Sequence, residues 1–375
     1  MTEKKNKKKK TSFVSSLFLV LNVVIVVLLL SCYAVPYISP DRFWPVVFLG
    51  YAYPAILLIN ILFVVFWLLK LKVWLVISLI AILAGWNQIR AYINYTGDKE
   101  ATKQTNSISI MSFNVRYFDR YSWVNTENVQ TRNNIFNLID NECPDIICFQ
   151  EFYSDLTPDF NTTDSLALEH GLPYFHTAYA LVKSKSRSYG IATFSRYPII
   201  YRDSHNFTNN IYNFAVITDI VVETDTFRVF NIHFESIRLS EEDRLFINDL
   251  SRQVDTQEET VAKYRQIFTK IRFASSLRAS QSKEIRMLVE SSPYPVIICA
   301  DLNDTPSSYP YNQLTRNLKD AFVESGNGLG NTYIGFLPAF RIDYILYDPV
   351  FRSNSYRTIR EKLSDHYPII TNLEY

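Results

Sequence analysis

The sequence predicts an α/β fold, a four-layer sandwich of two packed, mainly antiparallel sheets flanked by helices and preceded by three transmembrane helices. Three observations predict it. Long charge-free runs fill the first ninety residues, short β-rich runs dominate the rest, and helical periodicity is confined to a few segments. Strands that are apolar throughout are covered on both faces, so two packed sheets with helices outside them are the expected architecture.

The charge-free runs at residues 11–40, 43–69 and 73–89 predict the three transmembrane helices. Each is long enough to approach or cross a hydrocarbon core of about 30 Å. A cleaved signal peptide is the alternative for the first run. That run is too long, lacks a small-residue cleavage site and is followed by two further apolar runs, so we expect a multi-pass integral membrane protein.

The distribution of cations predicts the orientation. Six lysines lie within residues 4–10, Lys70 and Lys72 separate the second and third runs, and only Arg42 lies between the first two. The positive-inside rule then places the N-terminus in the cytoplasm and everything after the third span in the periplasm or outside the cell. We expect a basic tail at 1–10, a three-span region at 11–92 that contacts the lipid bilayer, a linker at 93–105 and one folded domain at 106–375.

The folded domain is mildly acidic. Residues 96–375 contain 28 Lys and Arg against 35 Asp and Glu, a formal charge of −7. This balance argues against a broad basic face that grips nucleic acid, but it leaves room for a small local site. Nothing in the sequence indicates an obligate protein partner.

Within this domain we predict eight strands and two main helices. Helical periodicity occurs at 131–142 and across about 258–290, and the highly charged stretch at 235–260 is expected to be a surface insertion. The predicted strands span residues 107–115, 146–149, 191–197, 214–223, 227–234, 296–301, 342–348 and 369–374.

Polar residues recur where these strands end. One such residue alone is more often a turn former or a loop cap. Several strand ends that change abruptly from apolar to polar indicate that the ends converge on one rim, where ligand sites are common. The residues concerned are Asn114, Glu151, Asn231, His233, Asp301, Asn303, Asp343, Asp365 and His366.

Their chemistry predicts a divalent metal and proton transfer. Carboxylates that lie close together repel one another unless a cation sits among them. Glu151 with Asp301 or Asp365, assisted by Asn114, offers the hard oxygen ligands that suit Mg²⁺ or Mn²⁺, and such an ion typically handles phosphoryl oxygens. An imidazole titrates near neutrality, so His233 and His366 are candidates to move or orient protons. In this scheme Asp343 orients the imidazole.

Seven segments, in this order, resemble the successive motifs of the endonuclease/exonuclease/phosphatase superfamily, which has the deoxyribonuclease I-like fold. They are MSFNVR, DIICFQE, YGIATFSRYPI, FNIHFES, PVIICADLNDTPSS, RIDYIL and LSDHYPI, and they cover residues 106–375. The sequence ADLN stands where the family more often has Gly-Asp-Phe-Asn, so that Ala300 and Leu302 replace residues that only pack.

The resemblance implies a role for each candidate residue. Glu151, Asn114 and Asp365 would bind the metal. Asp301 and Asn303 would position or deprotonate the attacking water. His366, oriented by Asp343, would contact the scissile phosphate, and His233 would stand near the leaving group. Asn303, His366 and Asn231 would contact the substrate.

The expected function is a membrane-anchored, Mg²⁺-dependent phosphoesterase that hydrolyses phosphodiester bonds and is nuclease-like. Two alternatives stay open. One is a phosphodiesterase or phosphatase acting on lipid head groups, because the anchor holds the domain against a bilayer. The other is a non-catalytic scaffold, which would be expected to have lost Glu151, Asp301 or His366, and all three are present.

Overall fold

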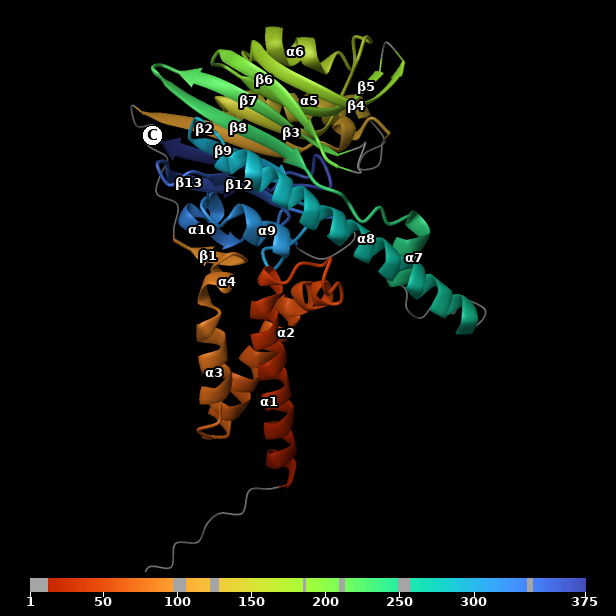
Figure 1. Cartoon of the computed structure of the whole chain (residues 1–375), viewed down its shortest axis with the longest axis vertical. Coiled ribbons are helices and arrows are strands. Elements are labelled where there is room, and N and C mark those ends of the chain that lie inside the picture. The colour runs from red at the N-terminus through yellow and green to blue at the C-terminus, as the bar shows by residue number, and fades with distance from the viewer. Residues whose placement is uncertain are drawn as a thin grey trace, which may run out of the picture.

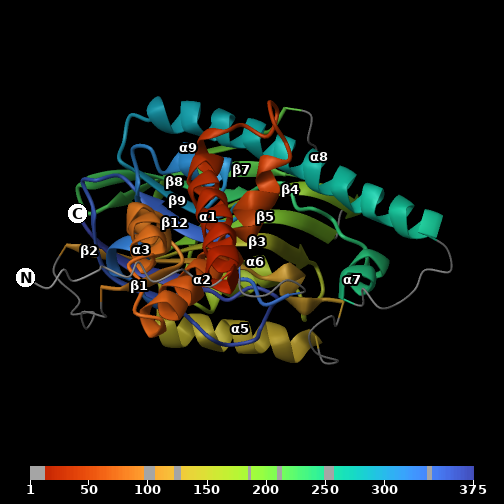
Figure 2. The same cartoon turned by 90° about the horizontal axis from the view of Figure 1, so that it is seen from below.

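The computed structural model describes residues 13–96, 106–121, 128–184, 187–208, 213–248, 257–335 and 340–375. A narrow helical bundle stands against one side of a larger two-sheet domain (Figure 1), and from below the bundle lies under the middle of that domain (Figure 2). The predicted basic tail at 1–10 and most of the predicted linker lie outside the described residues.

The bundle contains two helices that are long and apolar enough to cross a membrane, α1 (Phe13–Ala34) and α2 (Val46–Leu69). A short 3₁₀ helix, η1 (Val35–Tyr37), follows α1. Buried polar side chains tie the bundle together: Asn22 donates to Ser78 Oγ at 2.6 Å and accepts from Trp67 Nε1 at 2.8 Å.

The prediction of a third span of membrane-crossing length is wrong. The third apolar run forms α3 (Leu75–Ala84), of only 10 residues, and a separate short helix, α4 (Trp86–Arg90). Gly85 lies between them, and the ring of Tyr33 fills the space that a side chain at this position would need, so glycine fits here. Glycine also weakens a helix interior.

Two six-stranded sheets form the core of the larger domain. The first has the order β13-β14-β2-β3-β5-β4 and the second β10-β12-β9-β8-β7-β6. Each sheet is mixed, with one parallel pair, β2 with β3 and β8 with β9, in an otherwise antiparallel order. The strands are β2 (Ser107–Asn114), β3 (Ile146–Asp155), β4 (Tyr174–Ser184), β5 (Arg187–Ser195), β6 (Ile199–Asn206), β7 (Phe214–Val222), β8 (Asp225–His233), β9 (Val296–Asp301), β10 (Lys319–Asp320), β12 (Asp343–Tyr347), β13 (Arg352–Thr358) and β14 (Ile369–Glu374).

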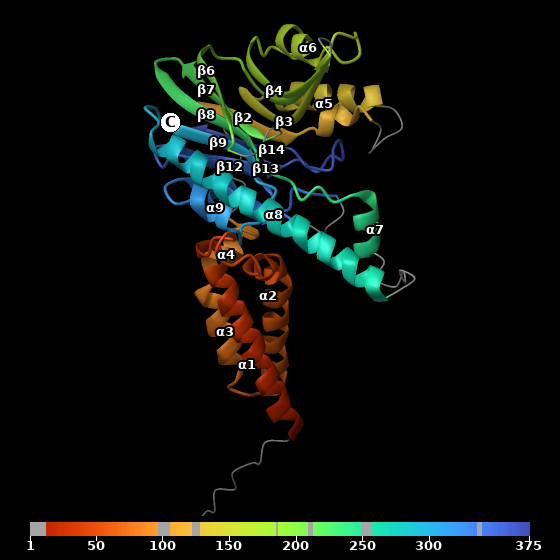
Figure 3. The same ribbon diagram turned by 45° about the vertical axis from the view of Figure 1, so that its right-hand side comes forward.

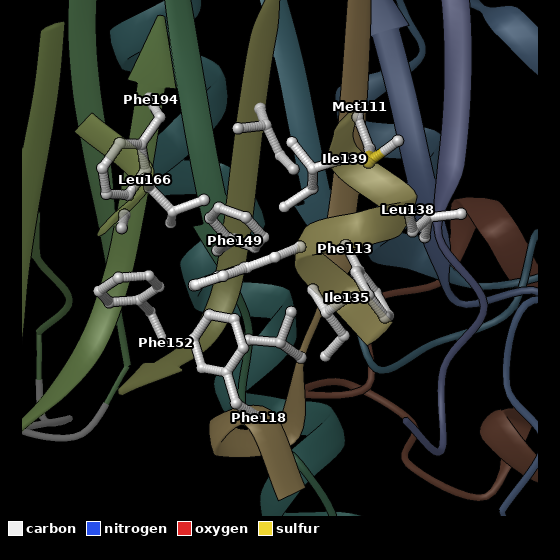
Figure 4. Packing of buried hydrophobic residues seen from close by; sticks show 14 of the residues in the cluster. Met111, Phe113, Phe118, Ile135, Leu138, Ile139, Phe149, Phe152, Leu166 and Phe194 are labelled. Atoms are coloured by element: carbon white, nitrogen blue, oxygen red, sulfur yellow. The ribbon is translucent and has the colours of Figure 1, made fainter. Parts of the chain in front are cut away.

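Helices cover the outer face of each sheet, as the sequence predicts (Figures 1 and 3). The helices of this domain are η2 (Arg116–Asp119), α5 (Asn128–Glu142), α6 (Thr162–Leu168), α7 (Glu241–Asn248), α8 (Gln257–Glu290), α9 (Tyr309–Leu314) and α10 (Ala321–Ser325). Of these, α7 covers neither sheet and lies beside the N-terminal half of α8, beyond the sheets. Isoleucines and leucines of α5 pack on phenylalanines of β2 and β3 (Figure 4), and Ile285 of α8 belongs to the cluster on the outer side of the second sheet.

Alternation along β2 assigns each side chain to a layer. Met111 and Phe113 face α5, whereas Ile108 and Ile110 belong to the cluster between the two sheets. Asn114 has the same parity as Ile110, so it faces the other sheet at the very end of its strand. This placement lets a residue of one sheet contact the strand ends of the other.

The bundle is joined to the domain by hydrogen bonds and a small sheet. Gln88 Nε2 donates to Ser307 Oγ at 2.5 Å, and the Tyr92 hydroxyl lies 2.8 Å from the same atom. The buried guanidinium of Arg341 donates to the Ala91 carbonyl at 3.0 Å. Strand β1 (Ile93–Tyr95) pairs with β11 (Asn327–Leu329). These contacts hold the bundle and the domain in a defined orientation.

Candidate active site

In the second sheet, the strand register places three of the predicted residues side by side. His233 ends β8 and pairs with Asp301, which ends β9, and Asp301 pairs with Asp343, the first residue of β12. Residues paired in register project on the same face of a sheet. The apolar-to-polar change at these strand ends therefore produces one row of an imidazole and two carboxylates.

In the first sheet, a β-bulge aims Glu151. The register of β3 against β5 shifts between Phe149 and Phe152, and the backbone of Glu151 is in the left-handed region with φ +50°. A bulge inserts an extra residue and redirects a side chain, and left-handed backbone at a non-glycine residue is strained. The bulge directs Glu151 into a pocket instead of into the core.

One hydrogen bond connects the two sheets at this rim. Asn114 Nδ2 donates to Asp301 Oδ2 at 2.9 Å, and Asn114 Oδ1 accepts from the backbone of Arg116 at 3.1 Å. Both side chains are buried, with Asn114 1% exposed. The carboxylate of the second sheet is thus held against the first sheet, where Glu151 lies.

His366 and Asp343 form a buried pair. Their closest atoms, His366 Nδ1 and Asp343 Oδ2, are 2.9 Å apart, and the Asp343 amide donates to Thr332 Oγ1 at 3.1 Å. His366 Nε2 lies 3.9 Å from Asp301 Oδ2. Burial alone would lower the pKa of His366, but the carboxylates of Asp343 and Asp301 outweigh it and raise that pKa well above its ordinary value.

Asn303 is also strained and lies beside Asp301. Its backbone has φ +50°, its amide donates to Asp301 Oδ1 at 2.9 Å, and its Nδ2 donates to the Phe234 carbonyl at 3.0 Å. The turn after β9 therefore fixes both side chains relative to each other. Asn tolerates left-handed backbone better than most residues, which fits its place in this turn.

The donor set fits a hard divalent cation. Burial, together with the carboxylates of Asp365 and Asp301, raises the pKa of Glu151. His233 Nε2 is buried without a hydrogen-bond partner among the described residues, 3.6 Å from Asp301 and 3.8 Å from Glu151. Possible ligand atoms of Asp301, Asp343 and His366 lie within 4.8 Å of one another. Carboxylate oxygens at this density are compatible with Mg²⁺ or Mn²⁺.

These groups line a pocket of about 340 Å³. Of the predicted residues it contains Glu151, Asp301, Asn303, Asp365 and His366, and it adds groups that the sequence analysis missed. His233 lines a neighbouring pocket that shares Glu151. The missed groups include Arg116, Arg238, Arg244, Tyr333 and, from helix α2 of the bundle, Tyr51.

Arg116 is the missed residue with the clearest sequence signal. It follows Asn114 by two positions in MSFNVR, and its guanidinium lies 3.5 Å from Asp365. The arginines at 238 and 244 lie in the charged stretch that we expected to be a surface insertion, and Tyr51 lies in a predicted transmembrane run. Neither location suggests a pocket residue.

Asn231 is placed away from the pocket. Its side chain is fully buried between the sheets, donates to the Ala192 carbonyl at 2.9 Å and accepts from Gln150 Nε2 at 2.8 Å. Its amide is engaged in linking the two sheets. The structure therefore does not bring Asn231 together with the other predicted substrate-binding residues.

Comparison with solved structures reveals similar folds. An endonuclease/exonuclease/phosphatase from Beutenbergia cavernae DSM 12333 has a TM-score of 0.51 and 15% identity, covering 72% of each chain. One from Bacteroides vulgatus has 0.51 and 19%, covering 72% of this chain and 98% of its own. The human Nocturnin catalytic domain with bound sulfate has 0.50 and 15%, covering 72% and 94%. At these identities the likeness supports the fold alone.

Comparison with protein families assigns most of the chain. Residues 15–92 match a domain of unknown function (DUF8431), and residues 111–366 match the endonuclease/exonuclease/phosphatase family. No curated protein matches the sequence significantly. The second match spans more than half of the chain and includes every predicted site residue, and only β14 and the start of β2 lie outside it among the strands of the two large sheets. The chain therefore belongs to the endonuclease/exonuclease/phosphatase family and is an enzyme that hydrolyses phosphoester bonds.

Proposed function

We propose that this protein is a membrane-anchored, Mg²⁺-dependent phosphodiesterase with nuclease-like chemistry, acting at the pocket that Glu151, Asp301 and His366 line. The observation that supports it best is the hydrogen bond from Asn114 to Asp301, because it joins the strand ends of both sheets around one pocket. Acidic, amide and imidazole groups that are far apart in the chain thereby surround a space large enough for a phosphate.

In this proposal Glu151, Asp365 and Asn114 hold the metal, with Asp301 near enough to join them. A bound Mg²⁺ would polarise the phosphoryl group and neutralise charge on the leaving oxygen. Arg116, 3.5 Å from Asp365, orients that carboxylate. Asn114 and Glu151 come from the first sheet and Asp365 from the loop before β14, and the hydrogen bond from Asn114 holds Asp301 of the second sheet beside them, so the folded domain preorganises these groups.

The remaining residues act on water and phosphate. Asp301, held by the Asn303 amide, accepts the proton of the attacking water as its oxygen bonds to phosphorus. His366, kept protonated and oriented by Asp343, donates from Nε2 to a phosphoryl oxygen. The bond from phosphorus to the leaving oxygen breaks, and His233 or water supplies the proton that this oxygen needs.

Two substrate classes are compatible with this chemistry, an external nucleic acid and a phospholipid head group. The second is favoured by a specific observation, because Tyr51 of the apolar helix α2 lines the pocket. The acidic charge of residues 96–375 further disfavours a long polyanion, since such ligands need an extended basic surface.

The test uses the full chain in lipid nanodiscs with Mg²⁺. Plasmid DNA, RNA, phospholipids and a chromogenic phosphodiester are offered separately, with EDTA as the metal control. Hydrolysis of at least one substrate that EDTA abolishes is the expected result. No hydrolysis of any of them, by a protein with a normal thermal unfolding transition, would favour the scaffold alternative instead.

For localisation we propose that α1, α2 and the α3–α4 segment anchor the chain, with a cytoplasmic N-terminus and the catalytic domain in the periplasm or outside the cell. The basis is the lysine distribution together with three passes of the chain: α1 and α2 are each long enough to cross a membrane, and the α3–α4 segment brings the chain back to the catalytic domain (Figure 1). A reporter fused after Tyr375 tests it. Reporter activity only in the cytoplasm would contradict this orientation.

A further inference from the structure

Beside the bundle, the N-terminal half of α8 forms an apolar groove that the proposed reaction does not use. Residues of α8 spaced at about one helical turn contribute one face of it, and Trp44, just before α2, contributes the other. Its lining is Trp44, Val261, Tyr264, Arg265, Phe268, Thr269 and Arg272. Val261 is 51% exposed and Phe268 42%, so the groove is open to an occupant.

The groove and the catalytic pocket lie along one face of α2. Trp44 lines the groove, the ring of Phe48 packs 5.2 Å from that of Phe268, and Tyr51 lines the catalytic pocket. Phe48 and Tyr51 are three positions apart on α2, the spacing of one helical face, and Trp44 lies in the turn just before the helix. The anchor therefore forms a wall that is common to both cavities.

The contacts around this wall keep its position fixed. Arg278 of α8 donates to the Tyr51 hydroxyl at 3.0 Å and to Asp304 at 2.9 Å, while Ser276 donates to Asp41 before α2. Ile271 packs on the apolar cluster at the start of α2. In Figures 1 and 3, α7 and this half of α8 project beyond the sheets on the side where the bundle lies.

The two cavities differ in chemistry in a way that matches an amphiphile. The catalytic pocket carries carboxylates, His366 and three arginines, which suit a single phosphoester group and a hard cation. Among the described residues that line the groove, most are aromatic or aliphatic, and Arg265 and Arg272 are the charged ones. Arg272 lies 5.9 Å from the centre of the Trp44 ring, so a cation borders the apolar surface. A phospholipid combines an anionic head group, which would match the charged catalytic pocket, with hydrocarbon chains, which would match the apolar groove.

We propose that the anchor and the catalytic domain together form a two-part site for a phospholipid, with its phosphoester in the catalytic pocket and a hydrocarbon chain in the groove between Trp44 and Phe268. The inference rests on the proposed function for the pocket but adds the substrate class and the apolar subsite. Helix α2 is itself apolar enough to lie in a bilayer, and its first turns lie between the two cavities, with Phe48 on Phe268 and Tyr51 in the catalytic pocket.

The experiment compares two esters that differ only in their alkyl chain, ethyl p-nitrophenyl phosphate and hexadecyl p-nitrophenyl phosphate. The full chain in nanodiscs is assayed with both in Mg²⁺, by release of p-nitrophenol. We expect Phe268→Glu to lower kcat/KM for the hexadecyl ester by about tenfold or more, because a buried carboxylate next to a hydrocarbon chain is unfavourable. The kcat/KM for the ethyl ester should change less than about twofold.

Matched variants control for folding and charge. Phe273→Glu places the same charge on the same helix at a side chain that is 62% exposed and outside the groove lining. It should leave kcat/KM unchanged for both esters. Phe268→Leu keeps an apolar side chain and should restore hydrolysis of the hexadecyl ester. Binding of hexadecylphosphocholine to each variant, measured by equilibrium dialysis with the nanodisc, gives a readout that needs no turnover.

The outcomes separate the two proposals. Equal effects of the 268 and 273 substitutions, or no effect of Phe268→Glu on the hexadecyl ester and on hexadecylphosphocholine binding, would overturn the two-part site. If the unmodified protein hydrolyses neither ester while hexadecylphosphocholine binds in a way that depends on Phe268, the proposed reaction fails but the apolar subsite stands. Cleavage of nucleic acid and of neither ester would overturn the lipid assignment alone.

Discussion

The buried pair of His366 and Asp343 provides the sharpest prediction, and the perturbation is Asp343→Asn. The two side chains are 5% and 2% exposed, and Nδ1 and Oδ2 are 2.9 Å apart. At that separation and an effective dielectric constant of about 20, the attraction between the two charges is about 6 kcal/mol before desolvation is subtracted. The net loss of interaction free energy is smaller for two reasons. Burying an uncharged amide costs less hydration than burying the Asp343 carboxylate, and the amide oxygen can still accept a hydrogen bond from Nδ1.

We therefore expect Asp343→Asn to lower kcat for a chromogenic phosphodiester by about a hundredfold, or ~2.7 kcal/mol in transition-state stabilisation. The pH dependence of the rate tests the cause. Because the carboxylate raises the pKa of His366, its removal lowers that pKa, and the alkaline limit of activity should move to lower pH.

Asp348→Asn is the matched control, since Asp348 directly follows the other end of β12 and accepts a hydrogen bond from the Val350 amide. It should leave the rate and the pH profile unchanged. Asp343→Asn with a rate within twofold of the unmodified protein, and with a normal thermal unfolding transition, would refute the role proposed for the pair.

Three further predictions concern the site and the α7–α8 segment. His366→Ala and Asp301→Asn should each lower turnover at least about a hundredfold without unfolding the domain, as steady-state rates and circular dichroism would reveal. Glu151→Gln should raise the Mg²⁺ concentration for half-maximal activity by about tenfold or more, and unchanged Mg²⁺ dependence would remove Glu151 from the ligand set. Although burial alone would raise it, hydrogen bonds from Lys270 and Lys263 hold the pKa of Asp243 well below its usual value. This carboxylate therefore stabilises the fold above its unfolded pKa, and the stabilisation is lost as pH falls through the folded pKa. Asp243→Asn should make α7 more susceptible to proteolysis at neutral pH, with the difference disappearing in acid.

The strand ends could be predicted from the sequence, because the change from apolar to polar residues occurs within a few neighbouring positions. A buried strand that stops at Asp301 or at Asn114 shows an abrupt change in polarity, and such changes can be recognised without a structure. The family resemblance then ordered these ends correctly, and the family match and the two-sheet architecture confirm that assignment. The catalytic and metal-binding roles themselves stay predictions.

Whether a residue lies at the rim or deep between the two sheets was harder to predict from the sequence. Asn231 and His233 are two residues apart on β8 and share a face, yet His233 reaches the rim while Asn231 is fully buried and links the sheets. Only the partner strands decide which of the two is covered. The bulge at Glu151 is similarly set by pairing between β3 and β5, which the residues of β3 alone do not encode.

The residue that the helical bundle contributes to the catalytic pocket was the hardest to predict from the sequence. Hydropathy describes α2 as lipid-facing throughout, so Tyr51 carries no signal of a pocket residue. The third run is interrupted at Gly85, between α3 and α4, and the close contact of Gly85 with Tyr33 is one between helices that a sliding window along one segment does not register.

The hydrogen bonds between the bundle and the domain affect which truncated forms of this enzyme are suitable for biochemical work. Arg341 and Arg278 are almost completely buried, and each donates to a group of residues 13–96, Ala91 in one case and Tyr51 in the other. A truncated protein that starts after the helical bundle would leave two guanidinium groups without these acceptors and would open one wall of the catalytic pocket. Soluble fragments are thus expected to underestimate both the stability and the selectivity of the intact molecule.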